Sequence, residues 1–280
     1  MKDYLRDLVR GTPDGLRARL MVREYLQARL LQHMQDAGAF STWAFLGGTC
    51  LRFLFSMPRF SEDLDFSLID GAADDRFRAM MLAIKAACAA ETYRVRVTLN
   101  ERKTVRSAFV MFPGLFHEFG LSPHRDEALS IKVELDARPP AGAHTTVSIV
   151  RRHVLLSLLH YDQASLLSGK LHALLARAYT KGRDVYDLVW YLSDRSWPAP
   201  NLPLLNNALK QTHWAGRPLT ATSWRTVLQR KLATLDWARV AADVRPFVER
   251  PADVALLTHS HVMALLGAHQ QRDMLTRTAR

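Results

Sequence analysis

The chain has 280 residues, of which 48% are hydrophobic and 23% are charged, so it is long and apolar enough to fold around a large core, and its composition is that of a globular rather than a disordered protein. Lys and Arg number 38 against 27 Asp and Glu, giving a net charge of +11 that favours a polyanionic partner, nucleic acid first and an acidic protein second. With two isolated cysteines, no apolar run of 18 residues and no signal peptide, we expect a cytoplasmic protein with no disulfide framework, no thiolate zinc site and no membrane partner.

The first 150 residues mix helix and strand patterns. After a charged, turn-rich start, apolar residues at three-to-four spacing predict a helix over residues 16–37. The elements expected next are a strand at 43–46, a short helix at 49–55, a strand at 63–68, a helix from about Asp74 to 91, strands at 93–100 and 107–112, a loop at 114–129, and strands at 130–136 and 146–150. The pattern is not a regular βαβ repeat, so it predicts an α+β fold with a mixed sheet.

The composition changes near residue 150, beyond which there is little strand pattern. Helices are expected at 163–179, 184–192, 202–212, 222–235, 237–248 and 252–270. We therefore predict two domains: residues 1–150, an α/β core with an N-terminal helix, and residues 151–280, a helical region.

Two acidic residues alternate with apolar ones along the strand at 63–68. In an extended chain Asp63 and Asp65 project from the same face. Two carboxylates this close repel each other unless a cation lies between them, and hard oxygen ligands favour Mg²⁺ or Mn²⁺. The pair therefore indicates a metal site, although a solvated strand face would show the same alternation.

A glycine turn precedes these acids. Gly47 and Gly48 follow a buried strand and begin a short helix, whose free amide groups and positive dipole end favour a phosphate, and the hydroxyl of Thr49 could bind the same phosphate. Fourteen residues separate Gly48 from Asp63, which is enough for one short helix and a return to an adjacent strand. The acids would then lie beside the bound phosphates.

A third acid on a neighbouring strand would complete a two-metal site. The strand at 130–136 places Glu134 and Asp136 on one face, and we favour Glu134 because Asp136 lies nearer the proline-rich end of the strand. The alternative is that both are surface acids paired with Lys132.

The run Phe45–Leu68, with Gly47-Gly48-Thr49, Pro58-Arg59-Phe60-Ser61 and Asp63-Leu64-Asp65-Phe66, closely resembles the AbiEii-type nucleotidyltransferases. These are toxins of type IV toxin–antitoxin systems, with the MenT toxins as relatives, in the DNA polymerase β-like nucleotidyltransferase superfamily. The resemblance implies a nucleotidyltransferase core, an NTP substrate and a divalent metal held by Asp63, Asp65 and Glu134.

Outside this run the resemblance is less sharp. Ile131-Lys132-Val133-Glu134 looks like the family's second motif, and Lys170 followed by Asp184-Val185-Tyr186-Asp187-Leu188 looks like its conserved lysine and D-x-x-D-L element. It implies catalytic roles for Lys170 and Asp184, with Lys170 also on the nucleotide. Arg59 and Ser61, just before the acids, would orient Asp63 or bind phosphate, or else fix the turn.

The resemblance further implies that an NMP is transferred to RNA, with the tRNA 3′ end as acceptor, which would block translation, and that a cognate antitoxin exists. Two alternatives stay open: a nucleotidyltransferase acting on a protein or small-molecule hydroxyl, and a non-catalytic module of the same fold that binds RNA or a partner.

Overall fold

The fold is that of a computed structural model, which describes residues 2–69 and 76–267. The predicted helix start at Asp74 lies outside the described residues. The described chain divides into two compact units. Within the described residues, unit 1 comprises residues 2–56, 60–69, 76–139 and 145–160, and unit 2 comprises residues 57–59, 140–144 and 161–267.

Seven strands of the described chain form one mixed sheet in the order β3-β4-β5-β2-β1-β7-β6. They are β1 (Trp43–Leu46), β2 (Leu64–Leu68), β3 (Arg96–Asn100), β4 (Val105–Pro113), β5 (Ala128–Asp136), β6 (Thr145–Arg152) and β7 (Val154–Tyr161). β2 pairs parallel with β5 and antiparallel with β1, while β3, β4 and β5 pair antiparallel in turn. The predicted mixed sheet of an α+β fold is therefore confirmed.

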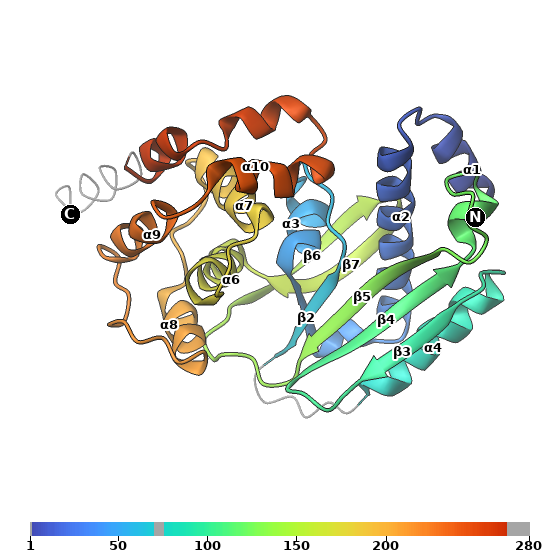
Figure 1. The fold of residues 1–280 in the computed structure, drawn as a ribbon. Helices are drawn as coiled ribbons and strands as arrows, with labels where there is room; N and C mark the ends of the chain where they lie inside the picture. Colours follow the sequence, from blue (N-terminus) through green and yellow to red (C-terminus); the bar gives the residue numbers. More distant parts are fainter. Residues whose placement is uncertain (1, 70–75, 268–280) are drawn as a thin grey trace. The chain divides into compact units, whose positions relative to one another are not determined.

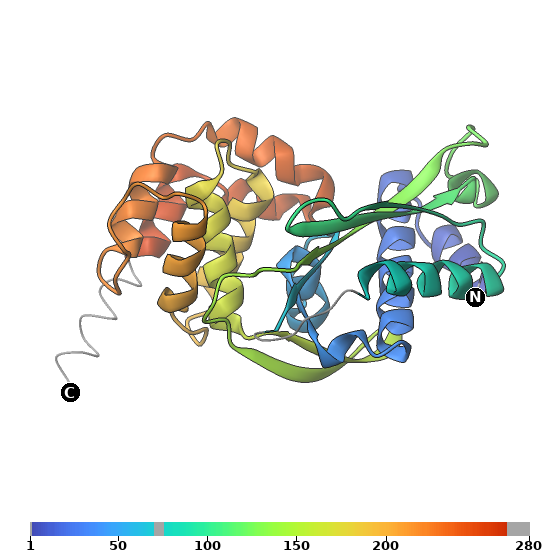
Figure 2. The ribbon, with the colours of Figure 1, turned by 90° about the horizontal axis from the view of Figure 1, so that it is seen from below.

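Five helices of unit 1 accompany the sheet: α1 (Lys2–Arg10), α2 (Gly15–Asp36), α3 (Gly47–Phe55), α4 (Phe77–Ala90) and α5 (Leu115–Glu118). The side chain of Asp14 caps α2 by accepting a hydrogen bond of 2.9 Å from the Leu16 amide. α2 packs against β5 and α4, and α4 lies alongside β3 and β4 (Figures 1 and 2). The helices bury one face of β3–β5, which carries Ala108, Val110, Ile131, Val133 and Leu135.

Unit 2 is helical, as predicted for the C-terminal region. Its α-helices include α6 (Gln163–Ala176), α7 (Gly182–Ser193), α8 (Leu202–Gln211), α9 (Trp224–Leu232) and α10 (Trp237–Val244). Asp162, Asn201 and Asp236 cap α6, α8 and α10 with their side chains. α6 packs against α7 and α8, and α7 against α10.

Several predicted elements were wrong. The start of the chain forms α1 instead of a turn-rich segment, the loop expected at 114–129 contains α5, and β7 follows residue 150, where no strand was expected. The helix predicted over 252–270 begins instead as a 3₁₀ segment, Pro251–Leu256, and the chain is α-helical only from 259 within the described residues. Residue 150, where the domain boundary was predicted, lies within β6, and the two-domain division at that residue stays a prediction.

Candidate active site

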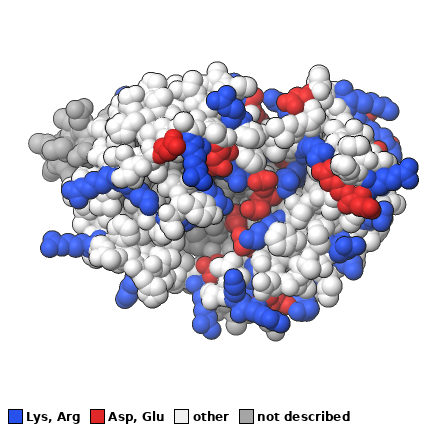
Figure 3. Space-filling view, in the orientation of Figure 1, with Lys and Arg blue, Asp and Glu red and all other residues white. Residues whose placement is uncertain are grey.

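The sheet of unit 1 gathers the acids of the sequence motif on one face. Asp65 in β2 lies directly beside Glu134 in β5, and these two strands run parallel. Asp63 precedes Asp65 by two residues, so the alternation of an extended chain puts it on the same face. Acidic side chains gather over β2 and β5 in the middle of the face shown in Figure 3.

Lys132 supplies a positive charge to this acidic face. Its Nζ atom lies 2.7 Å from Oε1 of Glu134, two residues along β5. Burial would lower the pKa of Lys132, but the hydrogen bond and charge of Glu134, and the charges of Asp63 and Asp65, outweigh it and raise the pKa. The ammonium thus counters the carboxylates where a metal cation would act.

The three carboxylates offer the hard oxygen ligands that Mg²⁺ and Mn²⁺ prefer. The Lys132 ammonium supplies the positive charge that a metal ion would otherwise supply beside them. In the conformation that residues 2–69 and 76–267 adopt, no three His, Cys, Asp or Glu side chains converge as closely as a metal centre needs. Asp63, Asp65 and Glu134 could hold a metal if their side chains close on it.

The glycine turn brings the start of α3 against the same acids. Gly47 has a φ of +81°, and a Cβ atom there would clash with Oδ2 of Asp65, so only glycine suits this position. α3 begins directly at Gly47, and its N-cap residue Leu46 has an apolar side chain that makes no cap hydrogen bond. Free amides at a helix start favour a bound phosphate.

Thr49 is fully buried, and its hydroxyl donates a hydrogen bond to the backbone carbonyl of Asp63. It therefore holds α3 against the segment that leads into β2. The Ser61 carbonyl accepts a hydrogen bond of 3.1 Å from the Gln27 side chain of α2.

The register separates the two candidates for the third acid. Asp136 lies beside Ser67 and Val105 rather than beside Asp65. Burial raises the pKa of Asp136, and its Oδ1 accepts a hydrogen bond of 2.9 Å from the Arg138 amide. Glu134 is thus the acid nearer to Asp65 along the sheet.

A second charged cluster, in unit 2, contains Lys170, Asp184 and Arg59. The Arg59 guanidinium donates two hydrogen bonds, of 2.6 and 2.7 Å, to the carboxylate of Asp187, and both side chains are buried. Lys170 Nζ lies 2.6 Å from Asp187 and 3.2 Å from Asp184. Burial would lower the pKa of Lys170, but these two carboxylates raise it.

Arg177 follows the last residue of α6 and forms an ion pair with Asp184. Two carboxylates of α7 are therefore surrounded by three cations: Arg59, Lys170 and Arg177. The cluster holds α6, α7 and the segment 57–59 together.

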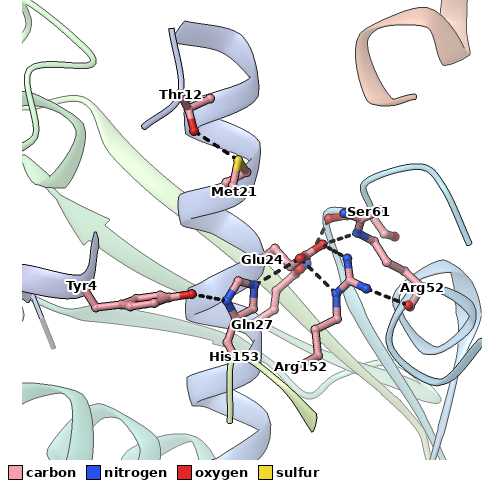
Figure 4. A network of polar contacts seen from close by, with 9 residues as sticks. All are labelled: Tyr4, Thr12, Met21, Glu24, Gln27, Arg52, Ser61, Arg152 and His153. Carbon is pink, nitrogen blue, oxygen red and sulfur yellow. Dashed lines mark hydrogen bonds and ion pairs between the residues drawn. The ribbon is translucent and has the colours of Figure 1, made fainter. Parts of the chain in front are cut away.

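A buried carboxylate of α2 supports α3 from within unit 1. Figure 4 shows Glu24 at the centre of a network in which it pairs with Arg52 of α3 and with Arg152 and His153, at 3.0 and 3.1 Å. Tyr4 of α1 contacts the other ring nitrogen of His153 at 3.1 Å. The network thus fixes α3, whose N-terminus lies beside Asp65, to three other elements.

Comparison with known proteins decides the family. The model of one family matches residues 29–259, and that family is described as the nucleotidyl transferase AbiEii toxin of type IV toxin–antitoxin systems. The chain belongs to the AbiEii family. The resemblance inferred from the run Phe45–Leu68 is therefore confirmed, and the AbiEii family supports an enzyme of the nucleotidyltransferase kind.

Two solved structures share the fold of this AbiEii chain. JHP933 from Helicobacter pylori is 16% identical, with a TM-score of 0.51, over 93% of this chain and 98% of that chain. A second H. pylori structure, described as that of a candidate nucleotidyltransferase, is 15% identical, with a TM-score of 0.51, over 90% and 95%. Among proteins with curated functions, no sequence matches. None of the helices that the structure describes is long and apolar enough to cross a membrane.

Within unit 1 the structure brings together the motif residues of the AbiEii run, namely Gly47, Asp65 and Glu134. Lys170, Asp184 and Arg59 form their own cluster in unit 2, and their roles stay predictions. Sequence reasoning missed the Arg59–Asp187 pair and the Glu24 network, because no local spacing links residues 128 positions apart. It considered Lys132 only as a surface partner, although its two-residue spacing from Glu134 indicated a shared face.

Proposed function

We propose that this AbiEii protein transfers an NMP group from an NTP to RNA, with the 3′ end of tRNA as acceptor. The family description supports the transferase class and a toxic role opposed by an antitoxin. The charge of +11 supports a polyanionic acceptor rather than a cationic small molecule. Capping the tRNA 3′ end would block translation, in the cytoplasm.

The observation that carries the proposal is the register between β2 and β5. It supports a site in which Asp63, Asp65 and Glu134 act together, beside the uncapped start of α3. The first amides of α3 would bind the phosphates of the NTP. By family likeness, Lys170 would bind phosphate and Asp184 would orient Lys170, since the two are paired within unit 2.

Mg²⁺ or Mn²⁺ held by Asp63, Asp65 and Glu134 would neutralise phosphate charge and make the acceptor hydroxyl more acidic. The hydroxyl oxygen then forms a bond to the α-phosphorus as the bond to the leaving pyrophosphate breaks. Glu134 or Asp65 accepts the hydroxyl proton. The protein's contribution is mainly positioning and charge compensation.

The test uses the full chain, total tRNA, Mg²⁺ and each α-³²P-labelled NTP in turn, resolved on a denaturing gel. Asp65→Asn should reduce label transfer at least ~100-fold, since it removes one charge and one proton acceptor from the site. Glu134→Gln should do the same.

Asp136→Asn is the matched control, because Asp136 lies on the same strand but not beside Asp65, and it should retain transfer. Label transfer that persists in Asp65→Asn would contradict the assignment of the site. If label appears on protein or on small molecules and not on RNA, the acceptor is a protein or a small molecule instead of RNA. Failure to bind Mg²⁺-NTP at all would favour a non-catalytic module.

A further inference from the structure

The acidic face of the sheet continues without interruption across β4 and β3. In the register of the antiparallel strands, Ser107 lies opposite Glu134 and Phe109 lies opposite Lys132. Beyond them, Thr98 lies opposite Phe109, and Arg96 lies opposite Met111. Residues opposite each other in a sheet point to the same side, so these side chains share the face of the proposed catalytic acids.

Phe109 is exposed on this face. Its side chain is 43% accessible, whereas its neighbours in β4, Ala108 and Val110, are fully buried on the helix side. Val105 of the same row is 40% accessible. An aromatic ring left open on a sheet face, one strand from charged residues, contributes nothing to the core that α2 and α4 cover.

The charges around Phe109 differ on its two sides. Towards β5 and β2 lie the carboxylates of Glu134, Asp65 and Asp63. Towards β3 lies Arg96, which is exposed, as is Arg94 two residues before it. Neither arginine forms an ion pair with any residue in the described ranges, whereas Lys132 is paired with Glu134.

We propose that the open face of β3–β5 binds the single-stranded end of the RNA acceptor, with its terminal bases stacked on Phe109 and its phosphates on Arg94 and Arg96. The proposal rests on the proposed function and names where that function's acceptor binds. Phe109 thereby becomes an acceptor-binding residue.

Charge decides the orientation of the strand. Carboxylates repel phosphates, so the part of the face beside Glu134 is suited to an uncharged base, and the part beside Arg96 is suited to the backbone. Base stacking on an aromatic ring tolerates any sequence and needs an unpaired base, because the bases of a duplex are already stacked. The ligand is therefore a single-stranded end rather than a stem.

The spacing agrees with catalysis on the same end. Adjacent strands lie roughly 5 Å apart, and two residues along a strand span roughly 7 Å. Phe109 lies opposite Lys132, two residues along from the row that contains Glu134 and Asp65, so it is roughly 8 Å from Glu134 and roughly 12 Å from Asp65 along the sheet. A base on Phe109 would leave the terminal ribose within reach of the acids. A protein partner such as an antitoxin could also cover an apolar ring. The test distinguishes the two occupants, because it measures the binding of RNA alone.

The test measures binding of a short, fluorescently labelled single-stranded RNA by anisotropy, with EDTA and without NTP, so that catalysis plays no part. Phe109→Ala should weaken this binding about tenfold, because the substitution removes the ring on which a base stacks. Phe109→Trp should keep binding close to that of the native protein. Arg96→Ala should lower the dependence of binding on salt by about one phosphate contact.

The matched control is Ile149→Ala. Ile149 lies on the edge strand β6 and is 75% exposed, so its substitution removes an exposed apolar side chain away from Phe109 and should leave binding unchanged. The same RNA annealed to its complement should bind to Phe109→Ala as tightly as to the native protein. In the transfer assay, Phe109→Ala should raise the KM for RNA and leave the KM for NTP unchanged.

The proposal is overturned if Phe109→Ala binds single-stranded RNA as the native protein does, if duplex binding falls equally, or if the native protein binds no RNA. RNA binding that depends on Phe109, in a protein that transfers no nucleotide to RNA, would uphold this binding face and refute the proposed reaction. Nucleotide transfer to RNA that proceeds equally well in Phe109→Ala would uphold the proposed reaction and refute this binding face.

Discussion

Lys132 places a positive charge among three carboxylates of one sheet face, where a divalent cation would act. A lysine in this position has two consequences. It relieves the repulsion between the acids when no metal is bound, and it must move or share its partners when a metal binds.

Lys132→Met should therefore make the protein less stable without metal and more responsive to it. In EDTA we expect the loss of the ammonium to cost about 1 kcal/mol, a fall in Tm of about 2–4 °C. Mn²⁺ or Mg²⁺ should then raise the Tm of the variant more than that of the native protein, because the metal no longer competes with the lysine. Thermal melts with EDTA and with graded Mn²⁺ measure both.

Lys103→Met is the control for this substitution, since Lys103 is exposed outside the acidic face. It removes the same charge and should change neither the Tm in EDTA nor the response to Mn²⁺. An equal metal response in native protein and Lys132→Met would show that the ammonium does not compete for the carboxylates.

Among the helices, α6 and α7 depend on a buried charge cluster rather than on apolar packing alone. Asp187 is fully buried on α7 and neutralises Arg59 and Lys170, which come from a separate segment and from α6. Removing one member of such a cluster leaves other charges buried without compensation.

Asp187→Asn should destabilise the protein by about 3–5 kcal/mol, because two cations lose their closest carboxylate while the side chain keeps its shape. Thermal melts should show a fall in Tm of roughly 10 °C. Asp36→Asn, at the exposed end of α2, should leave the Tm nearly unchanged. A Tm for Asp187→Asn close to that of the native protein would mean that Asp184 alone can neutralise the cluster.

Helices and strands with a clear hydrophobic periodicity were predicted from the sequence. Helices and strands that depend on contacts with other parts of the chain were not. The long helix α2 and the alternating strand β5 lie where their patterns indicated. β7, Val-Leu-Leu-Ser-Leu-Leu-His-Tyr, shows little alternation in its sequence because leucines occupy both of its faces, including Leu155, which is 64% exposed. In α1, Leu5 alone is fully buried, so its apolar stripe is too short to recognise.

At the scale of the whole molecule, the motif of residues 45–68 predicted the family, and the alternation in β2 and β5 predicted which of their acids share a face of the sheet. The rest could not be predicted, because it depends on contacts between distant parts of the sequence. Glu24 meets Arg152, and Arg59 meets Asp187, through the fold and not through spacing. Each unit thus contains a fully or nearly fully buried carboxylate surrounded by cations, Glu24 in unit 1 and Asp187 in unit 2.

These two carboxylates predict how the protein responds to acid. Burial would raise the pKa of Glu24, but the hydrogen bond from His153 and the charges of Arg52 and Arg152 outweigh it and lower the pKa from 4.5 to about 2. Burial likewise opposes the ionisation of Asp187, and Arg59 and Lys170 outweigh it, so that its pKa is also lowered. Both groups bind protons more readily in the unfolded chain.

Their stabilisation is therefore fully present above the ordinary carboxyl pKa and is lost as the pH falls below it. For Glu24 the loss runs from about pH 4.5 towards pH 2 and amounts to about 3 kcal/mol. Urea unfolding at pH 7, 5 and 3 should show Glu24→Gln less stable than the native protein at pH 7, with the difference between the two reduced to roughly two fifths at pH 3. Glu118→Gln, which breaks a surface pair with Lys2, should change stability by at most about 1 kcal/mol. Parallel pH curves for native protein and Glu24→Gln would contradict a charged Glu24 in the folded state, because a neutral carboxyl contributes no such dependence.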